Sequence, residues 1–152
     1  MKFLIVSDTH GDDDSLRKLY KQYPNMDYYL HAGDSQSSSM AIYPFDSVEG
    51  NCDFYSFDRV RRIRTNRGDV LMKHFPHMNT LESKNVKFFI HGHTHRYELY
   101  VENAVITMCP GSLTLPRDGT EGTYILMDIS DDHIKIDIIE VESKKILTSL
   151  SL

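Results

Sequence analysis

The chain has 152 residues, of which 40% are hydrophobic, and it carries 17 basic and 22 acidic side chains. A chain of this length buries about 70% of its unfolded surface, so we expect one domain over residues 1–152. The net charge of −5 argues against broad capture of nucleic acid or anionic membrane. No stretch approaches the roughly 20 apolar residues that span a bilayer. Two cysteines make no disulfide framework, which predicts a cytoplasmic protein with reduced thiols.

Strand and helix patterns alternate in the first third of the chain. The apolar run Lys2–Ser7 predicts a buried strand. Three aspartates at 12–14 then cap a helix whose apolar residues recur at helical spacing until Pro24. Further strands are expected over Asp27–His31 and Phe45–Glu49, and a short helix is expected to begin within Ser35–Ser39.

The remaining two thirds are predicted to be mostly strand. A hairpin is expected with its arms over Val60–Thr65 and Val70–His74, and Thr80–Lys84 suggests a short helix. The other expected strands are Val86–His91, a segment through Val101, Val105–Met108, Tyr124–Ile129 and Ile134–Val141. This order predicts α/β layers with more than one sheet.

Polar residues follow the predicted strands at five places. These places are Asp8–His10, Gly33-Asp34, Gly50-Asn51, His74 and Gly92–His95. Because open α/β sheets bind ligands beyond the carboxyl ends of their strands, we expect the five segments to meet in one crevice. In extended chain, residues i and i+2 point to the same side, which would pair residue 8 with 10 and residue 93 with 95. Glycines at 11, 33, 50 and 92 permit close backbone approach.

The number of these side chains indicates the kind of site. Seven donors are too many for one tetrahedral zinc, and they suit two ions that share a bridging carboxylate and leave positions open for water and substrate. Oxygen and imidazole donors without thiolate favour manganese, iron, nickel or zinc over copper(I). The seven candidates are Asp8, His10, Asp34, Asn51, His74, His93 and His95.

The ordered set D-x-H, G-D, G-N-C-D, H and G-H-T-H resembles the calcineurin-like metallophosphoesterase superfamily. Within it, the chain is similar to the small single-domain YfcE-like phosphodiesterase branch. Pro110–Arg117 also resembles the P-G-S-x-x-x-P-R segment of that branch. The resemblance extends from about residue 3 to residue 128. It implies a four-layer αββα sandwich of two mixed sheets flanked by helices.

The resemblance also implies roles for the seven residues. Asp34 would bridge two divalent ions, for which Mn²⁺ is the first choice and Ni²⁺, Fe²⁺, Zn²⁺ and Mg²⁺ are the alternatives. A hydroxide between the ions would attack the phosphorus of a small phosphate ester, in the first place a phosphodiester, and the amide of Asn51 would reach a phosphate oxygen. The other ligands divide into Asp8, His10 and His95 on one ion and Asn51, His74 and His93 on the other.

Two positions depart from the family pattern. Larger relatives have a histidine, which can protonate the leaving group, where this chain has Cys52. A thiol with an ordinary pKa near 8.5 is a poor substitute, which predicts a preference for aryl and other good leaving groups. The branch pattern T-H-G-H is also lost, because His74 is followed by Phe75 and Pro76. His77 is interpreted as a solvated loop residue in preference to the missing acid.

Other polar residues are given structural roles. His31 is interpreted as a core residue or a support for a ligand, His91 as structural and His133 as a surface residue. A basic cluster over 59–67 is interpreted as a charged edge hairpin in preference to a surface that steers nucleic acid. Phe54, Tyr55 and Phe57 fit a substrate pocket, an oligomer contact or the core equally well. Formation of a homo-oligomer is therefore one of the alternatives.

Two other functions compete with hydrolysis. The first is a protein-binding scaffold of the kind found in the retromer coat, a relative of the same branch. A scaffold has no need of seven ligands, and all seven are present here. The second is a nuclease, which only the basic cluster favours.

Overall fold

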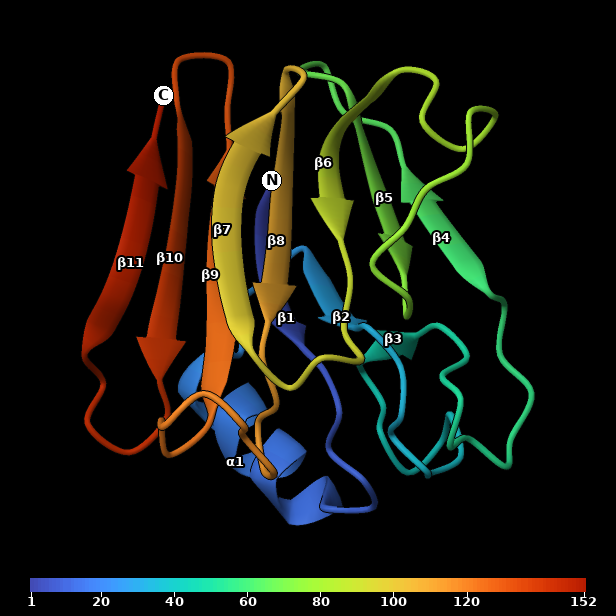
Figure 1. Cartoon of the computed structure of the whole chain (residues 1–152). Helices are drawn as coiled ribbons and strands as arrows, with labels where there is room; N and C mark the ends of the chain where they lie inside the picture. Colours follow the sequence, from blue (N-terminus) through green and yellow to red (C-terminus); the bar gives the residue numbers. More distant parts are fainter.

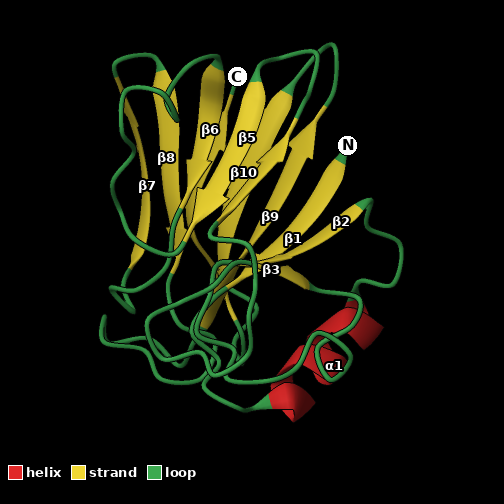
Figure 2. Ribbon diagram, turned by 90° about the vertical axis from the view of Figure 1, so that its right-hand side faces the viewer, coloured by secondary structure: helices red, strands yellow, loops and turns green.

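Two β-sheets face each other in this protein, and a single α-helix covers the outside of one of them. The computed structural model describes residues 1–152, and Figures 1 and 2 show its layers. The six-stranded sheet has the order β11 (Ile146–Ser151), β10 (Ile134–Glu140), β9 (Thr123–Ile129), β1 (Lys2–Val6), β2 (Tyr28–His31), β3 (Asp46–Ser47). The five-stranded sheet has the order β4 (Val60–Ile63), β5 (Asp69–Lys73), β6 (Val86–Ile90), β8 (Val105–Pro110), β7 (Tyr97–Glu102).

Each sheet contains three parallel strands, with antiparallel strands beside them. Strands β1, β2 and β3 are parallel, as are β5, β6 and β8, whereas β9, β4 and β7 each pair with them in the antiparallel sense. Parallel strands end on the same edge of a sheet, so the loops that follow them gather at one end of the sandwich. Figure 2 shows these loops beneath the sheets and next to α1.

The core lies mainly between the two sheets. Alternate residues of each strand point inward, so Phe3 and Ile5 of β1 face Phe88 and Ile90 of β6 within a cluster of 18 buried residues. The intervening residues of β1 point the other way. They pack with Leu16 and its neighbours from α1 in a second cluster of 10 buried residues.

Helix α1 (Asp13–Gln22) begins and ends where the sequence predicts. The carboxylate of Asp12 accepts a hydrogen bond from the backbone N–H of Ser15 at 3.1 Å, which satisfies one of the free donors at the helix start. Asp13 and Asp14 add negative charge to the first turn. The helix stops at Gln22, before Pro24.

Two predicted helices were wrong, and one strand was missed. Ser35–Ser39 is irregular until a turn begins at Ser39, and Thr80–Lys84 forms a turn. In the second segment Asn79 and Glu82 cap each other's backbone N–H groups, but left-handed Asn85 (φ 62°) ends the turn before a helix can extend. Strand β11 was not predicted because it lies on a sheet edge and is mostly half-exposed, which leaves a weak hydrophobic pattern.

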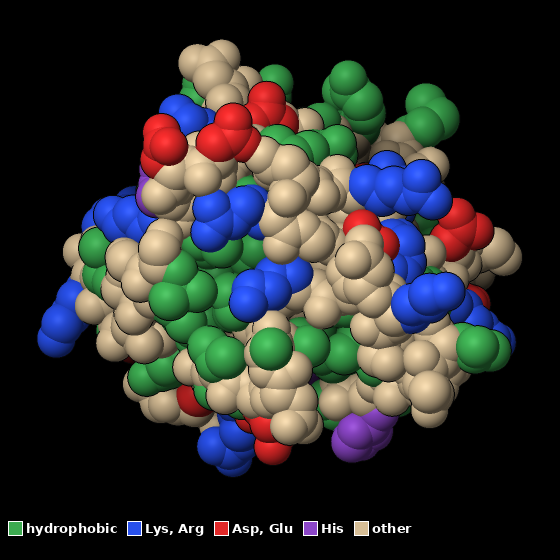
Figure 3. Space-filling view, turned by 90° about the horizontal axis from the view of Figure 1, so that it is seen from above, with side chains coloured by type: hydrophobic (Ala, Val, Ile, Leu, Met, Phe, Trp, Pro, Cys, Tyr) green, Lys and Arg blue, Asp and Glu red, His purple; other side chains and the backbone are tan.

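The fold class is confirmed as two mixed sheets in a sandwich, with the helical layers reduced to α1. On the outside of the five-stranded sheet a small apolar cluster of Leu71, Val86 and Phe89 lies where a helix was expected. The only helix has ten residues, and none is long and apolar enough to cross a membrane. At the end of the molecule opposite α1, Figure 3 shows basic side chains spread among acidic and apolar ones, without a uniformly basic field.

Truncating the core between the sheets should destabilise the fold strongly. Phe88 is fully buried, so Phe88→Ala is expected to lower the free energy of unfolding by about 3–5 kcal/mol through lost burial and the cavity left behind. Phe54 is 84% exposed, and Phe54→Ala should change that free energy by less than about 0.5 kcal/mol. Urea denaturation measures both, and equal losses would contradict this account of the core.

Candidate metal centre

All seven predicted side chains lie at the loop end of the sandwich. They come from the loops after β1, β2, β3, β5 and β6. Backbone hydrogen bonds join these loops: the N–H of Asp8 donates to the carbonyl of Gly33 at 3.0 Å, and that of Gly92 donates to the carbonyl of His74 at 3.0 Å. The five segments therefore lie next to one another at this end of the sandwich.

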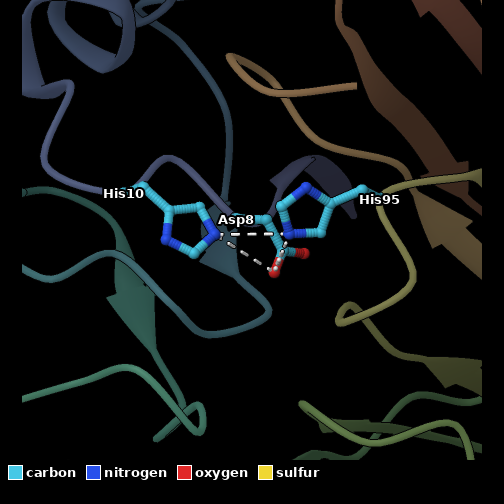
Figure 4. Close-up of side chains that lie close together, drawn as sticks. All are labelled: Asp8, His10 and His95. Carbon is cyan, nitrogen blue, oxygen red and sulfur yellow. Dashed lines mark hydrogen bonds and ion pairs between the residues drawn. The ribbon is translucent and has the colours of Figure 1, made fainter. Parts of the chain in front are cut away.

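One cluster is formed by Asp8, His10 and His95, which Figure 4 shows pointing toward one another. The Nε2 atom of His95 lies 3.3 Å from Oδ1 of Asp8 and 3.3 Å from Nε2 of His10. The His10 Nε2 atom lies 4.0 Å from the same carboxylate oxygen. Three donor atoms therefore meet around one point, as the ligands of a metal ion do.

A second cluster contains Asn51, His74 and His93. Oδ1 of Asn51 lies 2.8 Å from Nε2 of His74 and 3.0 Å from Nδ1 of His93. Asp34 joins this cluster, because its Oδ2 atom is 3.3 Å from Nε2 of His74. Donor atoms of Asp34 also lie within 4.8 Å of donors from Asp8 and, in another grouping, of His10. Asp34 thus lies between the two clusters, where a bridging ligand is expected.

The backbone at these residues does not have the conformation that the sequence suggested. Five of them have positive φ angles: Asp8 (55°), His10 (47°), Asp34 (59°), His93 (72°) and His95 (57°). The side chains converge because left-handed residues alternate with others in tight loops, so the expected extended backbone was wrong. Asp8 and His10 nevertheless face one cluster as predicted, whereas His93 and His95 face different clusters. Left-handed residues other than glycine cost about 1–3 kcal/mol each and concentrate at functional sites.

Glycines at 33, 50 and 92 allow the close approach that was predicted, whereas a Cβ atom at Gly11 would meet nothing within 4 Å. A Cβ atom at Gly50 would overlap with the carboxylate and backbone N of Asp34. A Cβ atom at Gly92 would overlap with Oγ of Ser7 and would come within 2.9 Å of Oδ2 of Asp8. Any side chain at these two positions would therefore displace a candidate ligand.

The hydrogen bonds of the first cluster leave its donor atoms facing each other. Oδ2 of Asp8 accepts hydrogen bonds from the Ser7 hydroxyl at 2.6 Å and from the backbone N–H of His93 at 3.1 Å. Oδ1 of Asp8 is buried and has no hydrogen-bond partner. The Nδ1–H of His95 donates to the carbonyl of Leu115 at 2.7 Å, so the neutral ring turns its Nε2 lone pair toward that oxygen. A buried lone pair facing a carboxylate oxygen is unfavourable unless a cation lies between them.

The second cluster has the same arrangement. The Nδ1–H of His74 donates to the carbonyl of Ala32 at 2.8 Å, which directs the Nε2 lone pair at the oxygens of Asn51 and Asp34. Metal-binding histidines commonly have their other ring nitrogen fixed in this way. The donors of both clusters therefore fit divalent cations.

The charges at the site favour ionised carboxylates. Burial opposes ionisation of Asp34, but the adjacent His74 imidazole, which could donate to this carboxylate when protonated, and the backbone N–H of Cys52 lower the pKa of Asp34 to about 2. Burial likewise opposes ionisation of Asp8, whose pKa is nevertheless lowered by His95 and Ser7. Because a protonated His95 imidazole could donate to the Asp8 carboxylate, Asp8 raises the pKa of His95. Burial alone would lower the pKa of His74, but Asp34 and Asp8 raise it overall. Protons on these histidines therefore compete with a metal ion.

Two supporting residues were not predicted. The carboxylate of Asp53 accepts backbone N–H groups of Asp34 at 3.0 Å, Gln36 at 2.8 Å and Gly50 at 2.7 Å, and thereby ties two ligand loops together. The side-chain oxygen of Gln36 lies 2.8 Å from Nδ1 of His10, which leaves Nε2 to face the cluster. Asp53 is part of the G-N-C-D motif, which was the available signal, whereas nothing in the sequence indicated Gln36.

The other histidines lie outside the two clusters, as expected. His31 supports the site, since its Nδ1 accepts the N–H of Gly33 and its Nε2 lies 2.9 Å from the hydroxyl of Thr9. Burial lowers the pKa of His31 to about 4 and keeps it neutral. His91 is buried with its Nε2 atom 3.3 Å from Glu98. His77 and His133 are exposed.

The basic cluster forms the charged edge that the sequence favoured. Strand β4 is the edge of its sheet. Arg61 and Arg62 pair with Asp46 at 2.5 Å and Asp69 at 2.7 Å, and these pairs occupy their guanidinium groups. Of the neighbouring aromatic residues, Phe57 packs against the core on the helix side, whereas Phe54 and Tyr55 are 84% and 51% exposed.

Removing the charge of Asp53 should weaken metal binding. An amide at this position loses one of the acceptor oxygens that hold the loops of Asp34 and Gly50, and supporting residues of this kind typically change metal affinity 10- to 100-fold. We therefore expect Asp53→Asn to weaken Mn²⁺ binding at least about tenfold in calorimetry. Asp58→Asn is the control, because the exposed Asp58 side chain has no hydrogen bond; equal affinities in both variants would contradict the role of Asp53.

Metal removal should change how stability depends on pH. Because the pKa values of His74 and His95 are raised in the folded protein, protonation of these two imidazoles stabilises the fold. The stabilisation is complete below their ordinary pKa of 6.5, and it is lost as the pH rises through the raised values. The contribution of Asp34 is present above 3.8 and is lost as the pH falls toward its lowered pKa of about 2. Chelator-treated protein should therefore lose free energy of unfolding from pH 6.5 to 8. Mn²⁺-loaded protein should gain it, because neutral imidazoles bind the ion. Parallel urea-derived profiles for the two forms would contradict this expectation.

Known proteins resemble this chain in sequence and in fold. The chain is 25% identical over 146 residues to "Probable metallophosphoesterase YsnB" of Bacillus subtilis (strain 168), covering 87% of this chain and 86% of that protein. A predicted phosphoesterase structure from Streptococcus pneumoniae TIGR4 superimposes with a TM-score of 0.84 at 21% identity, covering 99% and 96% of the two chains. The phosphoesterase Yfce from E. coli gives 0.76 at 17% identity, covering 99% and 98%.

A structure of a different kind of protein shares the fold. Vps29 of Entamoeba histolytica, in complex with Zn²⁺, superimposes with a TM-score of 0.71 at 16% identity, covering 100% of this chain and 98% of that one. The sequence model of one protein family, described as the calcineurin-like phosphoesterase superfamily domain, matches residues 1–132 of this chain. The chain therefore belongs to the calcineurin-like phosphoesterase superfamily.

Proposed function

We propose that this protein is a binuclear metal-dependent phosphoesterase that acts on phosphodiesters. One observation carries the proposal: two clusters of donor atoms share Asp34, and a buried carboxylate oxygen of Asp8 in one of them has no hydrogen-bond partner. When bound, two divalent ions would lower the pKa of a shared water to near neutrality and offset charge on the phosphate oxygens.

The residues divide between the ions as their positions suggest. Asp34 would bridge, and Asn51 would contribute its Oδ1 atom, which already faces two imidazoles. That orientation turns its Nδ2 group away from them, with only a 3.4 Å contact to the sulfur of Cys52, and leaves it available to a phosphate oxygen. The proposed ligands are Asp8, His10 and His95 on one side, and Asn51, His74 and His93 on the other.

The site offers no strong acid to the leaving group. Burial and the charge of Asp34 raise the pKa of the Cys52 thiol, which makes it a weaker acid than a free cysteine. His77 is exposed on its loop. We therefore infer a preference for substrates whose leaving groups depart without protonation, such as aryl oxides.

The donor set limits the metal without fixing it. Oxygen and imidazole ligands suit Mn²⁺, which we propose first, and also Fe²⁺, Ni²⁺, Zn²⁺ and Mg²⁺. The cysteines are unpaired, which suits the reducing cytoplasm, where we place the protein.

The alternative function is a protein-binding scaffold, and the fold that this chain shares with Vps29 is compatible with it as well as with an enzyme. Since a scaffold can also bind metal ions, metal binding alone does not separate a scaffold from an enzyme. Turnover does, so the decisive experiment measures hydrolysis together with metal content. A nuclease finds less support, because the arginines of β4 are paired with acidic residues.

Loss of the bridging carboxylate should abolish activity. Mn²⁺-reloaded wild type should contain about two ions per chain and hydrolyse bis-p-nitrophenyl phosphate. Asp34→Asn should bind fewer ions and lower kcat/KM by more than about a hundredfold, because a bridging ligand contributes more than a supporting residue. Asp132→Asn, a change at an exposed turn, should match wild type. Two bound ions without turnover of any phosphate ester would support the scaffold, and full activity of Asp34→Asn would refute the bridging role.

A further inference from the structure

A cavity of about 500 Å³ opens directly beside the second cluster. Asn51 and His74, two of the proposed ligands, line its inner wall, and Phe75 lies next to them. The volume is within the range of sites for small organic molecules. A phosphate held at the metal centre would therefore have room beside it for a substituent of the ester.

Phe75 presents an aromatic surface at this point. Its ring is 46% exposed although it packs edge-on against His74, at 5.3 Å between ring centroids, and tilted against His93 at 4.9 Å. Contacts with two imidazoles fix the ring in place while part of it stays open to solvent. The branch that this chain resembles usually has glycine after the ligand histidine, where this chain has Phe75.

The charged residues that line the cavity cancel one another. Arg59 pairs with Glu49 at 3.4 Å, and Lys73 pairs with both carboxylate oxygens of Glu82 at 2.8 and 3.1 Å. Two cations and two anions leave no net charge to attract a second phosphate. An uncharged organic group fits this lining better than a polyphosphate chain does.

We propose that the cavity binds the organic group of the ester, and that this group is a flat ring that stacks on Phe75. The inference rests on the proposed function, because the phosphate must be held by the metal centre next to the cavity. It narrows the substrate class to phosphate esters of aromatic or heteroaromatic groups. Phe75 would act as a specificity-determining residue, with no part in the bond-breaking step.

The proposal is tested by direct binding of two phosphonates to Mn²⁺-loaded protein in calorimetry. Phenylphosphonate and methylphosphonate carry the same anionic head, and their P–C bond is not hydrolysed. Each has a single organic group, so its placement is unambiguous. Wild type should bind phenylphosphonate about tenfold more tightly than methylphosphonate, from stacking and the burial of the ring.

Variants at position 75 assign this preference to the ring. Phe75→Leu keeps an apolar side chain without a π-face, and it should reduce the preference to about threefold or less. Phe75→Tyr should retain it. Phe54→Leu makes the same change at an exposed phenylalanine outside the cavity lining, and it should match wild type. An unchanged affinity for methylphosphonate in every variant would show that the metal centre is intact.

The unfavourable outcomes are distinguishable. Equal affinities of wild type for the two phosphonates, or a phenyl preference that persists in Phe75→Leu, would overturn the stacking role and leave the phosphoesterase proposal standing. Failure of both ligands to bind, together with no hydrolysis of bis-p-nitrophenyl phosphate, would overturn the proposed function and this inference with it.

Discussion

The organisation of the site depends on one buried carboxylate. Asp8 is fully inaccessible to solvent, and one of its oxygens has no hydrogen-bond donor. Leaving such a group uncompensated is costly, and the protein surrounds it with imidazole nitrogens that themselves offer lone pairs. The cluster is stable only if positive charge enters it, as protons on the histidines or as a metal ion. The site stabilises positive charge beside its carboxylates. The pKa values of Asp8 and Asp34 are therefore lowered, and those of His74 and His95 are raised.

This demand explains why the surrounding loops are so constrained. Five candidate ligands have left-handed backbone angles, and Asp53 uses both carboxylate oxygens to hold three backbone N–H groups. Strained residues persist only where neighbouring contacts leave them no alternative. Hydrogen bonds thus hold these loops in conformations that their residue types would not adopt alone, and they orient the candidate donor atoms toward one another.

Much of the fold and of the site was predictable, for different reasons. Strands β1 and β6 have continuous apolar runs, and α1 has its aspartate cap, so local signals sufficed. The candidate ligands were recognisable because they follow such strands in a fixed order. The backbone at Asp8 and His95 was not predictable, since only tertiary hydrogen bonds impose left-handed angles there. Gln36 and strand β11 gave no local signal, because a polar loop residue and a half-exposed edge look like ordinary surface.

Each cluster takes its donors from both sheets. His95 of the five-stranded sheet faces Asp8 and His10, and His74 and His93 of the same sheet face Asp34 and Asn51. The apolar core between the sheets is non-directional and would tolerate small sliding of one layer over the other. Ions held at this end would oppose such sliding, because coordination distances tolerate little variation. Metal ions bound by the two clusters would therefore hold the two layers in register, so occupancy of the site and rigidity of the whole sandwich should rise and fall together.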